Sequence, residues 1–185
     1  MAILTEANLA LIGAVGEPVT AASPLTADTL RRFTQAVMDP SDLSWDADAA
    51  GHSRYGAVVA PPLYPLHAFV RSSGTPDPLD RLADQPDWDG TVFTNSGLPP
   101  VDIPLKRLVN GGTEAWFYQL AKIGDVITAQ NRYADISERE GRSGPMVIVK
   151  TETRYTNQAG ELLAVVTRSA IWRGASCTKE AGVDQ

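Results

Sequence analysis

Strict alternation of apolar and polar residues marks the last third of the chain. In the run 146–155, one face would carry Val147, Val149, Thr151, Thr153 and Tyr155. The opposite face would carry the charged residues Lys150, Glu152 and Arg154. A period of two residues indicates a strand with one buried and one solvated face. The runs 125–136 and 162–172 are similarly rich in Val, Ile and Thr, and the turn-like stretches EREGRSGP and TNQAGE separate the three runs. We therefore expect three consecutive antiparallel strands.

The first half of the chain instead shows helical spacing. After a short apolar segment, residues 4–15, Thr26 can cap a helix that runs to about Met38, with Leu30, Phe33 and Val37 spaced i, i+3 and i+7 on one face. A second, buried helix is expected over residues 63–70, directly after Pro61 and Pro62. Pro65 would then lie in its first turn, where the missing N–H is tolerated.

Residues 72–104 show no period and are rich in Pro, Gly and Asp. A loop of this length inside a compact domain is more often a lid or a binding loop than a simple connection. Trp88 and Phe93 are its large apolar residues, and they could close over a ligand or only anchor the loop. Helices followed by a meander of long strands predict an α+β domain.

Composition supports a single domain and excludes several kinds of partner. The chain has 185 residues, of which 43% are hydrophobic and 21% charged, so we expect one folded domain over residues 1–173 and a disordered tail over 174–185. A net charge of -6 without a basic cluster argues against nucleic acid and membrane surfaces as partners. The lone Cys177 and the two histidines provide no metal-binding pattern, and no run is long enough to span a bilayer. We expect a cytoplasmic protein.

The stretch MDPSDLSWD, residues 38–46, follows the first predicted helix and carries three aspartates. It is either a carboxylate cluster or a polar turn, and Asp39-Pro40 alone is typical of a turn. His52 is the histidine nearest to Asp39 in sequence and could pair with it, although a loop role is simpler. His67, in LYPLHAFV, is interpreted as a core histidine.

Four stretches in order, YGAVVAPP, LVNGGTEAWF, KIGDVITA and EREGRSGPMVIVKTETRYTNQAGEL, resemble the MaoC-like dehydratases, in particular their N-terminal-type domain. This group includes R-specific enoyl-CoA hydratases and hydroxyacyl-carrier-protein dehydratases. The resemblance extends from about residue 11 to residue 173. It implies a hot-dog fold, in which an antiparallel sheet wraps a long helix and pairs with a second hot dog.

The resemblance also implies a catalytic motif of the form Asp-x-Asn-Pro-x-His-x-Asp. On this chain Asp39 and Asp46 match the two aspartates, and Ala50 matches an alanine four residues later. Ser44 occupies the histidine position. A serine hydroxyl does not ionise near neutral pH, so it cannot replace an imidazole in proton transfer.

A second departure concerns the donor for the thioester oxygen. Relatives use a backbone N–H at the start of the central helix, and the matching place here is Ala60-Pro61-Pro62. Proline has no N–H to donate. Trp116, Gly111 and Gly112 are further candidates for binding the acyl group, although aromatic residues there are equally compatible with a core or a subunit interface.

These features predict a subunit of an enoyl-CoA hydratase or 3-hydroxyacyl thioester dehydratase. The chain would shape the acyl tunnel, while a MaoC-like partner would supply Asp, His and the oxyanion donor. Two alternatives stay open: a self-sufficient homodimeric hydratase that uses Asp39 and perhaps His52, and a non-enzymatic acyl-CoA binding protein. No cofactor is expected, and the partners would be the CoA or carrier-protein thioester and a second hot-dog chain.

Overall fold

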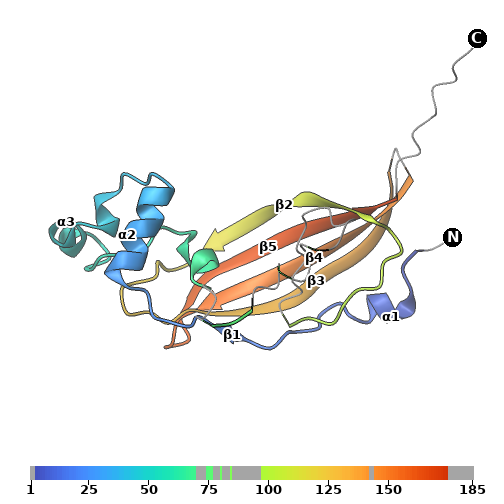
Figure 1. The fold of residues 1–185 in the computed structure, drawn as a ribbon, viewed down its shortest axis with the longest axis horizontal. Coiled ribbons are helices and arrows are strands. Elements are labelled where there is room, and N and C mark those ends of the chain that lie inside the picture. The colour runs from blue at the N-terminus through green and yellow to red at the C-terminus, as the bar shows by residue number, and fades with distance from the viewer. Residues whose placement is uncertain are drawn as a thin grey trace, which may run out of the picture.

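The computed structural model describes residues 3–69, 74–76, 80, 84, 97–141 and 144–174. An elongated antiparallel sheet dominates these residues, and its strands follow the order β1-β3-β4-β5-β2 (Figure 1). The strands are β1 (Val19–Thr20), β2 (Arg107–Phe117), β3 (Thr128–Gly141), β4 (Gly144–Thr156) and β5 (Leu162–Arg173). The three predicted strands are confirmed as β3, β4 and β5, which pair antiparallel in sequence order.

Short helices lie beyond the two ends of the sheet. The α1 helix (Glu6–Leu9) is near one end, whereas α2 (Ala27–Ala36) and α3 (Ala47–His52) form a lobe at the other (Figure 1). Two 3-10 helices, η1 (Asp42–Ser44) and η2 (Tyr64–His67), complete the described helical structure. Thr26 caps α2 as predicted, because its side chain accepts the Thr29 N–H and the Thr29 hydroxyl accepts the Thr26 N–H.

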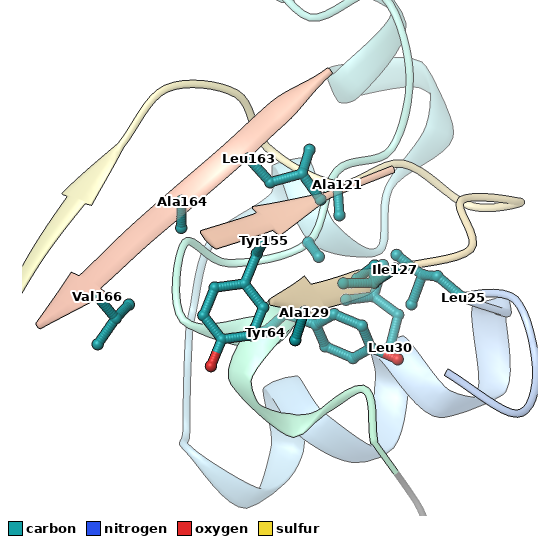
Figure 2. Packing of buried hydrophobic residues seen from close by; sticks show 11 residues of the cluster. Leu25, Leu30, Tyr64, Ala121, Ile127, Ala129, Tyr155, Leu163, Ala164 and Val166 are labelled. Carbon is teal, nitrogen blue, oxygen red and sulfur yellow. The ribbon is translucent and has the colours of Figure 1, made fainter. Parts of the chain in front are cut away.

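One face of the sheet carries two separate apolar clusters, and we call it the inner face. The first cluster lies at the α2 end, where Tyr155 of β4 and Ile127, just before β3, pack with Leu30 and Tyr64 (Figure 2). The second gathers around Tyr133, with further buried side chains from Leu98, Ile136, Val147 and Val149. Together they form the core of the described structure.

The helix expected over residues 63–70 is wrong. The chain forms only the 3-10 helix η2, after which Ala68 and Phe69 have no regular structure. The chain closes tighter turns instead, because the Pro61 carbonyl accepts the Tyr64 N–H at 2.9 Å and the Leu63 carbonyl accepts the Leu66 N–H at 3.2 Å. The longest helix of the described residues is therefore α2, with ten residues, rather than a long central helix.

The strand β2 was not predicted and lies at an edge of the sheet. It pairs with β5, from Arg107 opposite Arg173 to Phe117 opposite Ala164. A bulge interrupts the pairing between Asn110 and Thr113, and the Asn110 side chain accepts the Gly112 N–H at 2.8 Å. The sequence Asn-Gly-Gly obscured the strand because glycine weakens a strand pattern and commonly marks a bulge.

Some expectations concern residues outside the described ranges. They are most of the predicted loop 72–104, with Trp88 and Phe93, and the predicted tail from residue 175 onward, with Cys177. Within the described residues no helix is long and apolar enough to cross a membrane, and no cluster of three metal-ligating side chains occurs.

Candidate functional site

The motif stretch begins where α2 ends in a Schellman turn. The Asp39 N–H donates to the Thr34 carbonyl at 2.9 Å, and the Met38 N–H donates to the Gln35 carbonyl at 3.3 Å. Met38 adopts φ 53°, the left-handed conformation that this turn requires and that glycine normally supplies. The turn directs Asp39 away from the helix axis and into the following loop.

Both motif aspartates have structural hydrogen bonds. Oδ1 of Asp39 accepts the Ser41 N–H at 3.0 Å. Oδ1 of Asp46 accepts the N–H groups of Asp48 and Ala49 at 2.9 and 3.1 Å, and so caps α3. A carboxylate at a helix N-terminus is favoured by the helix dipole. Asp46 therefore stabilises the N-terminus of α3 in this structure.

Ser44, at the histidine position of the motif, is the last residue of η1 and is only 5% exposed. Leu43, the residue before Ser44, links η1 to the segment that follows α3. Its carbonyl accepts the Val59 N–H at 3.1 Å. Ala50, the motif alanine, is fully buried. The motif stretch thus lies in a packed part of the lobe, with a hydroxyl at the position that the family resemblance assigns to a histidine.

Neither histidine replaces the missing one. His52 ends α3 with an exposed side chain, and its Nδ1 lies 2.8 Å from the Asp48 carbonyl oxygen of the same helix. His67 is exposed, and its ring lies 5.1 Å from the ring of Phe33, so the interpretation as a core histidine is wrong. It is the last residue of η2 and does not lie in a buried helix. In the described part of the chain, no hydrogen bond or ion pair joins Asp39 to a histidine.

The segment expected to hold the thioester oxygen has no free donor at residues 60–62. Ala60 is fully buried, and its N–H donates to the Ala121 carbonyl at 2.8 Å. Pro61 and Pro62 have no N–H. The Pro61 carbonyl instead accepts the Tyr64 N–H at 2.9 Å, which closes the first turn of η2. This segment can line a pocket, but its backbone cannot stabilise an oxyanion at these three residues.

The β2 candidates lie apart from that segment. Gly111 and Gly112 form the bulge, and a Cβ on Gly111 would come within 2.9 Å of the Ile171 side chain. Ala115 packs against the inner-face cluster, so its neighbour Trp116 faces the opposite side of the sheet. Trp116 is 50% exposed there. The structure therefore does not bring Trp116 and Ala60 onto one surface of this chain, and the core reading of Trp116 is wrong.

Sequence reasoning missed Arg168. It lies on β5 two residues from Val166 and two from Ala170, so all three side chains share the inner face. The run 162–172 contained the relevant pattern, because Arg168 alternates with the apolar residues Val166 and Ala170. The two-residue period of a strand was therefore sufficient to place Arg168 on their face.

Comparison with known proteins settles the family. A family model described as FAS1-like, dehydratase domain region matches residues 10–166. This chain belongs to that family. It is thus a MaoC-like dehydratase domain with a hot-dog fold, and the α+β class predicted from the sequence is confirmed.

Individual relatives of this dehydratase domain are distant. A UPF0336 protein of Thermobifida fusca (strain YX) is 23% identical over 145 residues, which cover 78% of this chain and 80% of that protein. A chain of the ChsH1-ChsH2 complex from Mycobacterium tuberculosis matches with a TM-score of 0.65 and 15% identity, over 92% of this chain and 94% of that chain. A chain of the HadBC (3R-hydroxyacyl-ACP dehydratase) complex, also from Mycobacterium tuberculosis, matches with a TM-score of 0.55 and 20% identity, over 87% and 96%. These similarities show the shared fold.

Proposed function

We propose that this dehydratase domain is the acyl-binding subunit of an enoyl thioester hydratase or 3-hydroxyacyl thioester dehydratase that consists of two kinds of chain. In this assembly a MaoC-like partner supplies the aspartate, the histidine and the oxyanion donor. This chain lines the space for the acyl tail. The thioester carrier is CoA or an acyl-carrier protein.

The observation that carries the proposal is the buried Ser44 at the position of the catalytic histidine. Hydration of an enoyl thioester needs a base that takes a proton from water and an acid that protonates the α-carbon. A hydroxyl cannot perform either step near neutral pH. Since general acid–base catalysis contributes about 100- to 10,000-fold, this chain alone should be a very poor catalyst.

The missing oxyanion donor supports the same conclusion independently. The negative charge that develops on the thioester oxygen needs a preorganised donor, and loss of one such donor costs roughly 3 to 4 kcal/mol in known enzymes. Here the Ala60 N–H is already bonded to Ala121, and the next two residues are prolines. A single substitution would therefore not restore the site.

The β2 edge supports association with a second chain. Trp116, Phe117 and Tyr118 are 50%, 43% and 60% exposed at the end of this strand. An edge strand presents unpaired N–H and C=O groups, and exposed aromatic side chains on both of its faces favour association with another chain. Two of the similar solved structures are themselves complexes named for two proteins, ChsH1-ChsH2 and HadBC. A partner strand aligned along β2 would extend the sheet.

The proposal is tested by assays of this chain alone, of a MaoC-like partner alone, and of the two co-expressed and purified together. The measurement is loss of the enoyl absorbance of 2-enoyl-CoA substrates of increasing length, with size determined by light scattering. We expect a two-chain complex whose activity with long substrates exceeds that of either chain alone. Ordinary turnover by this chain alone would instead establish the self-sufficient enzyme. Tight thioester binding without turnover in any combination would establish a binding protein.

Ser44→His tests the role of the motif position. In this chain alone the variant should stay nearly inactive, because the oxyanion donor is still absent. Ser44→Ala is the matched control, since it removes the hydroxyl from the same buried position. In the complex, Ser44→Ala should retain activity, whereas a catalytic Ser44 would make this variant inactive.

A further inference from the structure

A polar row crosses the inner face of the sheet between the two apolar clusters. By register, Thr151 on β4 lies opposite Arg168 on β5, and Arg168 lies opposite Thr113 on β2. These three side chains point to the same face as Val166 and Val149, which belong to the first and the second cluster. We call Thr151, Arg168 and Thr113 the Arg168 row.

The Arg168 row is accessible, although its neighbours are buried. Val166 and Val149 are at most 1% exposed, whereas Arg168 and Thr113 are exposed and Thr151 is half-buried. A guanidinium on the face that otherwise buries the core is unusual, because charged side chains normally occupy the solvated face of such a strand. The Arg168 row is therefore an accessible polar strip between the two apolar clusters.

Within the described ranges no carboxylate neutralises Arg168. The strand neighbours Glu114 and Glu152 lie on the outer face, and Glu152 is bonded to Arg132 at 2.8 Å. Glu138 is on the inner face but farther along the sheet, and its Oε2 accepts the N–H groups of Ile3 and Leu4. With respect to the described residues, the positive charge of Arg168 is thus available to a ligand.

We infer that the Arg168 row binds a carboxylate carried by the acyl tail, so that this chain selects thioesters whose tails end in an acid. The inference rests on the proposed acyl-binding function. A guanidinium offers two parallel N–H donors that match the two oxygens of one carboxylate. The hydroxyls of Thr113 and Thr151 flank it on both neighbouring strands. Ala115, which is half-buried beside the first apolar cluster, would contact the methylene groups of the tail.

A phosphate of CoA fits this place less well than a carboxylate. The carrier bears several negative charges, whereas the neighbouring inner-face positions Asn110, Ala170 and Thr153 supply no second cation. One arginine balances one carboxylate. The apolar residues on either side of the row also favour a ligand whose charge is confined to its end.

Tyr155 lies on the inner face of β4, four residues from Thr151, within the first apolar cluster. Burial raises the pKa of its hydroxyl, and the positive charge of Arg168 and the Thr153 hydroxyl oppose this shift. The hydroxyl is therefore protonated at neutral pH and can donate to a carboxylate oxygen.

Calorimetric titration of the purified chain with matched acyl-CoA pairs tests the inference. Each pair has equal length and differs only at its end: glutaryl- and pentanoyl-CoA, adipoyl- and hexanoyl-CoA, suberoyl- and octanoyl-CoA, sebacoyl- and decanoyl-CoA. Free CoA is a separate probe. We expect at least one acid-ended tail to bind about tenfold or more tightly than its neutral counterpart, the gain typical of a charge-assisted hydrogen bond.

Arg168→Gln should abolish this preference, so that the two members of each pair bind equally. Arg154→Gln is the matched control, because Arg154 is an exposed arginine on the outer face of β4. Equal binding of both members of every pair would overturn the inference while the acyl-binding function stands. Weaker binding of free CoA by Arg168→Gln would assign the row to a phosphate and overturn it as well. Absence of binding by all thioesters, neutral ones included, would reject the acyl-binding function of this chain and the inference with it.

Discussion

The hydroxyl of Thr153 on β4 donates a 2.6 Å hydrogen bond to Oδ1 of Asn131 on β3, and both side chains are buried. This pair lies on the inner face beside the Arg168 row, where the sheet otherwise packs apolar residues. A buried amide oxygen that loses its donor costs more than the hydrogen bond itself contributes. The pair therefore joins β3 and β4, and this hydrogen bond offsets the cost of burying the two polar side chains.

We predict that Thr153→Val lowers the free energy of unfolding by about 1–3 kcal/mol, because valine leaves the buried Asn131 oxygen without this donor. Thr153→Ser is the matched control, since it keeps the hydroxyl and removes only a methyl group. The measurement is urea unfolding followed by circular dichroism. Equal stability of the valine and serine variants would show that the hydrogen bond is unimportant.

The turn after α2 predicts a stabilising substitution. Met38 has φ 53° and is 86% exposed, so replacement by glycine relieves the left-handed strain without removing packing. We expect Met38→Gly to raise the free energy of unfolding by about 0.5–1 kcal/mol, although added freedom of the unfolded chain offsets part of the gain. Met38→Ala keeps the strain and should leave the melting temperature nearly unchanged. A glycine variant no more stable than the alanine variant would contradict the strain argument.

The ion pair between Arg132 and Glu152 predicts a pH-dependent contribution to stability. The hydrogen bond from Arg132 lowers the pKa of Glu152, and the partial burial of Glu152 opposes this shift. Because the folded pKa is the lower one, the unfolded state takes up the proton first as the pH falls. The stabilisation is therefore present above the ordinary pKa of glutamate and is lost as the pH falls through the lowered value.

We expect Arg132→Gln to cost about 0.2–1 kcal/mol at neutral pH, the range for pairs near the surface, since the Arg132 side chain is 48% exposed. The difference from the unmodified chain should vanish in strongly acidic buffer. Urea titrations at several pH values measure it. A difference that persists unchanged in acid would assign the effect to packing of the arginine side chain.

The β2 edge predicts an association defect. Trp116→Lys should weaken assembly with a second hot-dog chain by about tenfold or more, because buried aromatic residues dominate many interfaces. The fold should be retained, since Trp116 is half exposed in this chain. Trp45→Lys is the control, because Trp45 is 62% exposed at the end of η1 and is not part of β2. Sedimentation or light scattering measures the assembly, and equal effects of both variants would argue against β2 as the contact.

Local patterns in the sequence were sufficient for several elements. Thr26 defines the start of α2 because its hydroxyl bonds within its own turn. The alternation around Val149 defines β4, and the TNQAGE stretch turns between β4 and β5, where Gly160 has φ 77°. The substitution of Ser44 for the motif histidine was equally visible. Each of these features depends on residues that are close in sequence.

Other features depended on contacts between distant segments, which a linear pattern does not encode. The β2 strand becomes recognisable only beside β5, because its Asn-Gly-Gly bulge and exposed residues conceal the alternation. Residues 63–70 were apolar enough for a helix, but Ala60 bonds to Ala121 and the chain forms only a 3-10 turn after Pro61. The face of β5 on which Arg168 lies could be predicted from the sequence. Only the sheet register, however, showed that no described acidic residue lies opposite Arg168. Tertiary structure decided these points because burial and pairing depend on neighbours that only folding brings together.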